Sequence, residues 1–273
     1  MTTARRRSRC CRAGRRPAGP GSRRGTTRTL PSSGTKWCVS GFLVCSHRRK
    51  PFHRRRTYMR IGILGAGGMA DALGTQWAGA GHEIMISGRD AEATAARAAR
   101  MAEGVRAGSW AEAAAFGEVV VVAVREAGLV DVLTACGGAL RGKPLVDVTN
   151  AADPSAYDPA RSPALLIGGL SGGHVVKAFN LCHVDVWRMM PPVFDGRPLA
   201  VPLCGDDPAA LAAARTLVSD LGCTPLDGGG LARVTQLEAT AAFMIGLWFG
   251  GADAQAVLPP LHQSGAHGVR PGA

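Results

Sequence analysis

The chain has 273 residues and a formal net charge of +12, but this charge is concentrated at one end. Residues 1–58 contain 17 of the 32 Lys and Arg residues and no Asp or Glu, which leaves 15 basic against 20 acidic residues from Met59 onward. A segment with this mildly acidic balance lacks the basic surface that nucleic acids require, so we exclude nucleic-acid binding by the folded part. The length suffices for one large or two small domains.

The first 58 residues are expected to form a disordered basic tail, because they are rich in Arg, Pro, Gly and Ser and too poor in apolar residues to bury a core. Their one apolar island, residues 37–45, is short and lacks a small-residue cleavage site, which argues against a secretory signal. Since Met59 directly precedes the first predicted strand, we interpret the tail as translated upstream sequence from a wrongly assigned start. An organelle transit peptide and a nucleic-acid-binding arm are the alternatives.

Cysteine spacing and hydropathy exclude further classes. Four of the eight Cys residues lie in the tail and four in the rest of the chain, none of them in a C-x-x-C pair or in the His/Cys spacing of a zinc site. We therefore expect no metal, no structural disulfide and a cytoplasmic location. The apolar stretch 239–251 is too short to span a bilayer, so we also expect no membrane contact.

The most informative stretch is residues 59–90, in which a glycine-rich turn joins a strand to a helix. An apolar strand at 60–64 leads into G-x-G-x-x-A, followed by a helix at 71–80 and a second strand at 82–87. This order is typical of a dinucleotide-binding βαβ unit. Gly65 permits the tight turn, Gly67 lets the backbone approach a pyrophosphate, and Ala70 is small enough for helix and strand to pack closely.

The helix that follows this turn predicts a phosphate site. The backbone N–H groups of Gly68, Met69 and Ala70 have no partner within the helix and point at the position of the phosphates. The alternative is a tight strand-to-helix turn that binds nothing. The strand–turn–helix–strand context favours the ligand site.

The end of the second strand indicates which dinucleotide binds. An NAD site has Asp or Glu about 20 residues after the glycine motif, whereas this chain has Ser87-Gly88-Arg89 there. A hydroxyl and a guanidinium can both donate to a 2′-phosphate, so the sequence predicts NADP. The alternative is a polar strand end in front of the next helix, for which Asp90 is the expected N-cap.

Apolar runs and helical segments alternate along the rest of the chain. The run VVVVAV at 119–124 predicts a central strand covered on both faces, and Val124 and Arg125 are candidates for contact with the cofactor beyond it. Asn150 follows the strand at 143–149, where it either contacts a ligand or caps the loop. Other strands are expected at 105–107, 174–180, 199–205 and 223–227, helices at 91–103, 126–140, 207–221 and 231–250, and a long loop at 151–173.

These residues resemble the NADPH-dependent reductases of the deazaflavin coenzyme F420. The resemblance covers residues 59–250 and rests on five segments in the family's order: 65–70, 87–89, VKAFN at 176–180, LCGDD at 203–207 and LDGGGL at 226–231. The last three are more specific than the glycine motif. They also occur in the cytosolic NADPH-binding domains of membrane metalloreductases, which use a flavin.

The resemblance implies an α/β fold, with a Rossmann-type doubly wound parallel sheet and a small C-terminal α/β extension. It implies reversible hydride transfer between C4 of NADPH and C5 of the deazaflavin, with the rings about 3–3.5 Å apart and no catalytic acid or base. It places Ala66, Gly68 and Met69 at the pyrophosphate, Ser87 and Arg89 at the 2′-phosphate, Val124 at the ribose, and Asn180 and His183 where the second cofactor approaches.

Two other functions fit the same pattern: an NADPH-dependent reductase of a flavin, an imine or a small carbonyl, and a non-enzymatic NADP(H)-sensing module. Pyrroline-carboxylate reductases share the first strand and turn, but their second domain is all helical, unlike the strands expected at 199–205 and 223–227. A Tyr-x-x-x-Lys proton donor is absent, because neither Tyr58 nor Tyr157 belongs to one.

The predicted organisation is a basic tail (1–58), an NADP-binding Rossmann domain (59–180), a small C-terminal domain (181–260) and a frayed end (261–273). The predicted helix at 231–250 is largely apolar, which indicates a core or subunit-interface helix and hence a homodimer. The expected partners are small-molecule cofactors that act as substrates.

Overall fold

The computed structural model of the protein describes residues 58–257. The predicted basic tail up to residue 57 and the predicted frayed end at 261–273 lie outside the described residues.

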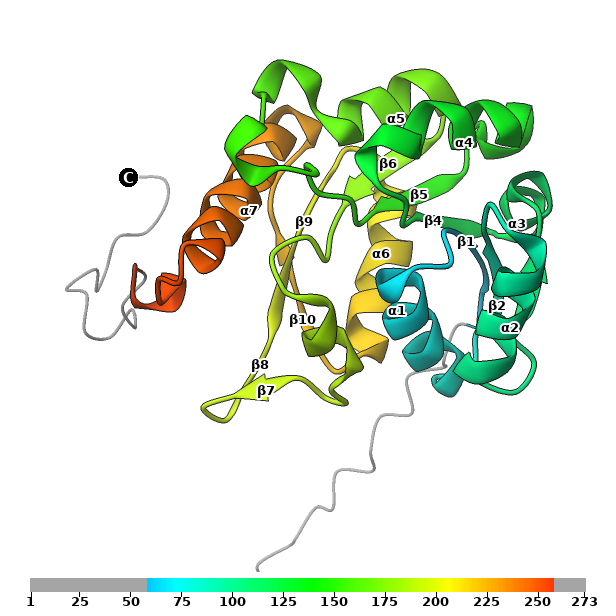
Figure 1. The fold of residues 1–273 in the computed structure, drawn as a ribbon, viewed down its shortest axis with the longest axis horizontal. Coiled ribbons are helices and arrows are strands. Elements are labelled where there is room, and N and C mark those ends of the chain that lie inside the picture. The colour runs from blue at the N-terminus through cyan, green and yellow to red at the C-terminus, as the bar shows by residue number, and fades with distance from the viewer. Residues whose placement is uncertain (1–57, 258–273) are drawn as a thin grey trace, which may run out of the picture. The chain divides into compact units, whose positions relative to one another are not determined.

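An eight-stranded sheet forms the centre of the fold, with strand order β10-β9-β6-β5-β4-β1-β2-β3 (Figure 1). The strands from β3 to β6 are parallel to their neighbours, while β9 pairs with β6 in the antiparallel sense and carries β10 beside it. The predicted α/β doubly wound sheet is confirmed. The strands are β1 (Arg60–Leu64), β2 (Glu83–Ser87), β3 (Arg106–Gly108), β4 (Val119–Val122), β5 (Pro144–Asp147), β6 (His174–Lys177), β9 (Ala200–Gly205) and β10 (Thr224–Asp227).

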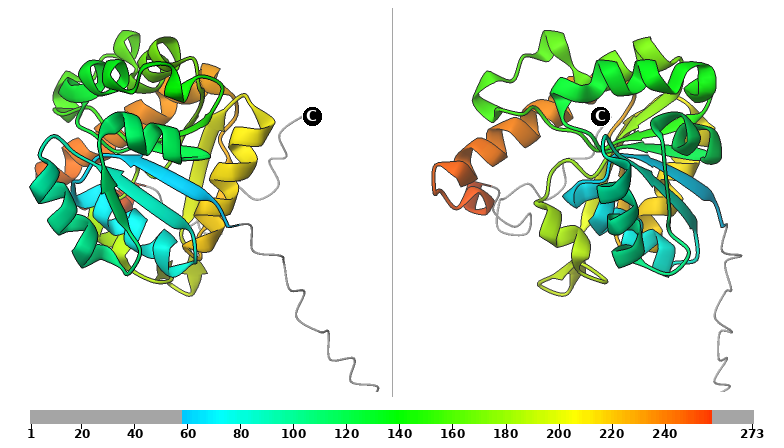
Figure 2. Two further views of the ribbon diagram at one scale, coloured as in Figure 1. Left: turned by 90° about the vertical axis from the view of Figure 1, so that its right-hand side faces the viewer. Right: turned by 45° about the vertical axis from the view of Figure 1, so that its right-hand side comes forward.

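Helices cover both faces of this sheet (Figure 2). They are α1 (Gly68–Gly79), α2 (Ala91–Met101), α3 (Trp110–Phe116), α4 (Leu129–Cys136), α5 (Pro163–Ser171), α6 (Pro208–Asp220) and α7 (Val234–Phe249). One core contains buried side chains of α1, α2 and α6, and the other contains those of α3, α4, α5 and the start of α7. Val121 of β4 faces the first core and Val120 the second, as expected for a strand buried on both faces.

Short elements complete the connections. They are the 3₁₀ helices η1 (Glu126–Gly128), η2 (Gly137–Leu140), η3 (Pro154–Ala156), η4 (Pro159–Arg161), η5 (Val184–Arg188), η6 (Leu231–Arg233) and η7 (Ala254–Val257), and the hairpin strands β7 (Val193–Phe194) and β8 (Arg197–Pro198). Within residues 58–257, no helix is both long enough and apolar enough to cross a membrane.

The C-terminal extension continues the main sheet, because β9 hydrogen-bonds to β6 and β10 to β9. The predicted domain boundary at residue 180 stays a prediction. Asp90 accepts a hydrogen bond from the backbone of α2, which confirms the predicted N-cap, and Asp207 caps α6 in the same way. Ser109 and Glu112 form a capping box at the start of α3.

The predicted loop at 151–173 is wrong in its second half, which folds into α5. Ser162 caps this helix by accepting a hydrogen bond from the N–H of Leu165, and Pro163 occupies its first position. The helix ends at Gly172, whose φ of +64° is left-handed. This Ser-Pro start was a usable signal, but the glycines of the segment obscured it.

Several predicted elements are shorter than expected. The helix predicted at 126–140 consists of η1, α4 and η2, with a change of direction at Gly137, where φ is +56°. The strand predicted to reach residue 124 ends at Val122, and the one predicted to reach residue 180 ends at Lys177. Arg125 and Asn180 therefore lie on loops at the carboxyl edge of the sheet.

Close packing of β1 against α3 generates a stability prediction. A Cβ added to Gly62 would overlap the carbonyl oxygen of Ala113. We therefore expect Gly62→Ala to lower the free energy of unfolding by about 1–3 kcal/mol. At Gly79, the last residue of α1, an added Cβ meets no atom, so Gly79→Ala should change the free energy by at most about +1 kcal/mol. Chemical denaturation measures the free energy of unfolding of both variants. Equal changes in the two variants would contradict the close packing of β1 against α3.

Candidate functional site

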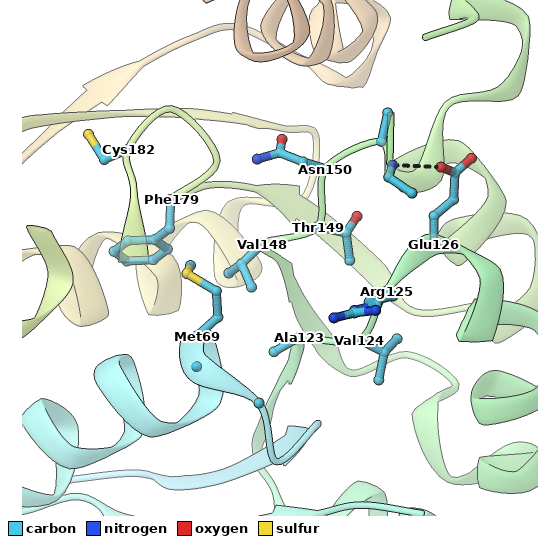
Figure 3. Close-up of a pocket in the computed structure, with 14 residues that line it drawn as sticks. Met69, Ala123, Val124, Arg125, Glu126, Val148, Thr149, Asn150, Phe179 and Cys182 are labelled. Carbon is cyan, nitrogen blue, oxygen red and sulfur yellow. Dashed lines mark hydrogen bonds between the residues drawn. The ribbon is translucent and has the colours of Figure 1, made fainter. Parts of the chain in front are cut away.

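A cavity of about 640 Å³ opens at the edge of the sheet where β4, β5 and β6 end, beside the start of α1 (Figure 3). Ligands of open α/β sheets bind at this edge, and the volume suits a small-molecule site. The residues that line the cavity are Gly67, Gly68, Met69, Ala123, Val124, Arg125, Glu126, Val148, Thr149, Asn150, Ala151, Ala152, Phe179 and Cys182.

The cavity brings together predicted residues from three elements. Gly67, Gly68 and Met69 come from the start of α1, Val124 and Arg125 from the loop after β4, and Asn150 from the loop after β5. The other predicted residues lie outside the lining. Gly65 and Ala66 belong to the turn between β1 and α1, Ala70 lies in α1, Ser87, Gly88 and Arg89 lie at the end of β2, and Asn180 follows β6.

The glycine turn has the geometry of a phosphate site. Gly65 has a φ of +142°, and a Cβ there would overlap the carbonyl oxygen of Ala123, so this position requires glycine. Gly67 is the N-cap of α1 and provides no side chain to cap the helix. Its added Cβ would meet no protein atom, because the position faces open space. The first N–H groups of α1 therefore face the cavity without a side chain in front of them, which fits a pyrophosphate.

The two donors predicted for the 2′-phosphate, at the end of β2, differ in their exposure. Arg89 is exposed, and no ion pair involves its side chain among residues 58–257. Ser87 is fully buried, and its hydroxyl donates to the carbonyl oxygen of Ile63 at 3.0 Å. The contact of the Ser87 hydroxyl with a 2′-phosphate stays a prediction, and donation to the phosphate would replace the bond to Ile63. Gly88 is needed for packing, because a Cβ there would overlap the Thr94 hydroxyl.

Asn150 and Asn180 are connected, but only Asn150 lines the cavity. The Nδ2 of Asn150 donates to the backbone oxygen of Asn180 at 2.9 Å. The Nδ2 of Asn180 in turn donates to the backbone oxygen of Leu237 in α7 at 3.3 Å, and its side chain is buried. Asn180 therefore positions the loop after β6 against α7, and direct contact with a second cofactor stays a prediction. His183, which the resemblance places beside it, is exposed.

A buried ion cluster lies directly behind this edge of the sheet. The Nζ of Lys177, at the end of β6, lies 2.8 Å from Oδ2 of Asp147 and donates to the backbone oxygen of Thr149 at 2.6 Å. It also lies 3.5 Å from Oε1 of Glu238 in α7. All three charged side chains are buried. The cluster therefore joins β5, β6 and α7.

Glu238 extends the cluster to the segment before α5. Its Oε1 accepts a hydrogen bond from the N–H of Ala164, and its Oε2 lies 3.5 Å from the hydroxyl of Tyr157. Burial and the negative charge of Glu238 raise the pKa of Tyr157 to about 12, so this phenol stays protonated near neutral pH. The cluster thereby fixes α5 and the loop before it on α7.

The segment after β6 lies across the start of α1. Phe179 has a φ of +60° and its ring packs edge-on against Trp77 of α1 and Trp187 of η5, at centroid distances of 5.8 Å and 5.2 Å. Farther along, Nη1 of Arg188 forms an ion pair with Oδ2 of Asp71 at 2.6 Å. This segment therefore connects the wall of the cavity to the helix that begins at the glycine turn.

The sequence analysis did not single out Phe179 or Cys182, although both line the cavity. The KAFN segment favoured Asn180, whereas Phe179 reaches the cavity lining from a left-handed backbone with a φ of +60°. Burial raises the pKa of the Cys182 thiol to about 11, so it too stays protonated near neutral pH. The buried Lys177 cluster was also missed, even though a Lys, an Asp and a Glu within apolar elements were visible signals.

With this geometry in hand, comparison with known proteins identifies the central domain. Residues 60–151 match the family described as NADP oxidoreductase, coenzyme F420-dependent. The chain contains a domain of this family. This NADP oxidoreductase domain runs from β1 to the loop after β5, so it includes the glycine turn, Arg89 and most of the cavity wall.

The NADP oxidoreductase domain has relatives of different kinds. The chain is 31% identical over 191 residues to metalloreductase STEAP3 of Rattus norvegicus, a match that covers 69% of this chain and 38% of that protein. The chain therefore spans well under half the length of this relative. A crystal structure from Arthrobacter sp. FB24, ascribed to an F420-dependent NADP reductase, is 29% identical with a TM-score of 0.62, covering 71% of this chain and 96% of that one.

A more distant neighbour supports the fold alone. A reductive aminase from Aspergillus terreus, solved with NADPH and ethyl-5-oxohexanoate, is 19% identical with a TM-score of 0.54, covering 71% of this chain and 64% of that one. Together the comparisons establish an NADP oxidoreductase domain on a Rossmann-like fold.

The buried cluster generates a prediction about stability. Lys177→Met leaves Asp147 and Glu238 as buried carboxylates without their cation, so we expect the free energy of unfolding to fall by about 3–5 kcal/mol. Adding Asp147→Leu removes one of these charges and should recover part of the loss. Denaturant unfolding of both variants and of Asp147→Leu alone measures the coupling. Strictly additive losses would contradict the cluster.

Proposed function

We propose that the cavity brings NADP(H) and the deazaflavin coenzyme F420 together for hydride transfer. The observation that carries this proposal is the shortage of acid–base groups in the cavity wall. Its titratable lining residues are Arg125, Glu126 and Cys182. The thiol has a pKa of about 11, and the carboxylate of Glu126 accepts a hydrogen bond from the backbone of Ala152 at 3.3 Å.

This wall suits one class of acceptor better than another. An imine or carbonyl acceptor needs a proton donor beside the atom that receives the electron pair. Two coenzymes with their own reactivity need mainly to be held face to face and shielded from water. The apolar residues Met69, Val148 and Phe179 can provide that shielding (Figure 3).

Each candidate residue then has a defined task. When bound, NADPH supplies a hydride from its C4 to C5 of the deazaflavin, which also takes up one proton from water, giving NADP⁺ and the reduced deazaflavin. The N–H groups at Gly68 and Met69 hold the pyrophosphate, Arg89 holds the 2′-phosphate, and Val124 contacts the ribose. Asn150, fixed by the backbone of Asn180, borders the position of the rings.

A flavin is the second candidate acceptor, because the segments at 176–180, 203–207 and 226–231 resemble those of metalloreductase domains that use a flavin. A metalloreductase is also 31% identical to this chain. The test follows NADPH oxidation by the full chain with purified F420, with flavin mononucleotide and with a cyclic imine in separate reactions. Turnover with the deazaflavin alone supports the proposal. Turnover with the imine alone, or NADPH binding without transfer to any acceptor, contradicts it and favours another reductase or the NADP(H)-sensing module.

Arg89 sets the coenzyme preference in this proposal. Arg89→Ala removes the only predicted guanidinium for the 2′-phosphate, so we expect the KM for NADPH to rise about 10- to 100-fold, as for a lost charge-assisted hydrogen bond. The KM for NADH should stay nearly unchanged. The matched control is Arg100→Ala, which removes an exposed arginine from α2. An equal effect of both variants would overturn the assignment.

We also propose that the chain acts in the cytoplasm as a homodimer. The second half of α7 leaves Phe243 and Phe249 with exposed fractions of 63% and 80%. Exposed aromatic residues on one helix are typical of a protein interface. Size-exclusion chromatography with light scattering should give the mass of two chains, which Phe249→Asp should reduce to one. A wild-type mass of one chain would contradict the dimer.

A further inference from the structure

Arg125 is a cation in the wall of the cavity. It is exposed on the loop between β4 and η1, and Figure 3 shows its guanidinium extending into the space beside Thr149 and Val124. Among residues 58–257, no hydrogen bond or ion pair of its side chain is found. By contrast, Arg97 and Arg188 nearby in the fold both pair with Asp71.

The adjacent carboxylate does not neutralise this cation. Glu126 follows Arg125 directly and also lines the cavity, but its Oε2 accepts a hydrogen bond from the N–H of Ala152, as the dashed line in Figure 3 marks. This bond holds the carboxylate against the loop after β5, on the far side from the guanidinium. The wall therefore offers a free fork of N–H donors, which matches the geometry of a phosphate.

The phosphates of the dinucleotide have other sites in the proposed function. The pyrophosphate lies at the start of α1, after β1, and the 2′-phosphate lies at Arg89, after β2. In the strand order β5-β4-β1-β2, Arg125 follows β4 and thus lies on the opposite side of β1 from Arg89. On that side its neighbours in the wall are Thr149 and Asn150. In the proposed function these residues border the acceptor.

We propose that Arg125 binds a phosphate group of the acceptor, so that the site selects a phosphate-bearing flavin or deazaflavin over the same ring without its phosphate. This inference rests on the proposed function, since it assigns the acceptor to the half of the cavity next to β4 and β5. The inference narrows the class of acceptor: the cavity binds an acceptor that carries a phosphate more tightly than it binds a neutral ring of the same shape.

The test compares acceptors that differ only in their phosphate. Flavin mononucleotide and riboflavin are the pair that meets this condition. F420 and its ribityl-deazaflavin fragment form a second, less strict pair, because F420 also carries a lactyl and glutamyl chain with carboxylates beyond its phosphate. Equilibrium dialysis against the full chain saturated with NADP⁺ gives the Kd of each, and NADPH oxidation gives kcat/KM. We expect the phosphate to tighten binding about 10- to 100-fold in at least one pair, as for a charge-assisted hydrogen bond.

Substitution of Arg125 then tests whether its guanidinium causes this preference. Arg125→Gln should abolish the preference for the phosphorylated member of the pair, while the Kd of the other member changes less than about threefold. Arg161→Gln, an exposed arginine on η4 outside the cavity lining, should leave the preference intact and controls for the overall charge. The inference reassigns Arg125 from the coenzyme contact expected from the sequence to the acceptor, so the Kd of NADPH should stay the same in both variants.

The outcomes separate the two proposals. A preference for the phosphorylated acceptor that survives Arg125→Gln overturns the inference. So does an Arg125→Gln variant that raises the Kd of NADPH and changes the Kd of both acceptors equally, because Arg125 would then bind the pyrophosphate of the coenzyme. Equal binding of both members in the wild type also overturns it. If no acceptor is reduced but Arg125→Gln still abolishes a phosphate-dependent binding preference, the proposed function fails and the anion site stands.

Discussion

Burial of the Lys177 ammonium group is the constraint on which the arrangement of the site depends. A charge removed from water is very unfavourable unless oppositely charged and hydrogen-bonding groups surround it. Here Asp147 and Glu238 supply those charges from β5 and α7, so these elements must meet at the end of β6. Thr149, whose carbonyl completes the cluster, is itself part of the cavity wall. The charge that holds the C-terminal helix in place therefore also fixes one side of the site.

From this anchor the chain reaches the other side of the site within a few residues. Phe179 turns through a left-handed backbone and packs between two tryptophans, and the segment then crosses to α1, where Arg188 pairs with Asp71. One continuous stretch thus connects the cavity wall with α1, the helix that begins at the glycine turn. Such a connection suits a reaction in which two bound rings must keep a fixed separation.

Local signals made much of this structure predictable, and long-range contacts account for the rest. The glycine turn, the central strand at VVVV and the caps at Asp90 and Asp207 depend on a few adjacent residues, and the structure has them. Ser87 is predicted to contact the 2′-phosphate, and this stays a prediction. In the structure its buried hydroxyl donates to the backbone oxygen of Ile63 on the neighbouring strand, a partner that no local pattern indicates. Likewise Asn180 bonds to α7, 57 positions away, and no local pattern indicates that partner.

Direct hydride transfer between two coenzymes in this cavity is tested most directly with NADPH that carries deuterium at C4, on one face or the other. The full chain is mixed with F420, and the reduced deazaflavin is analysed by mass spectrometry. We predict that deuterium moves from only one of the two faces and stays at C5, because hydrogen bound to carbon does not exchange with water there. NADPH oxidation that leaves the deazaflavin without label from either face would contradict direct transfer.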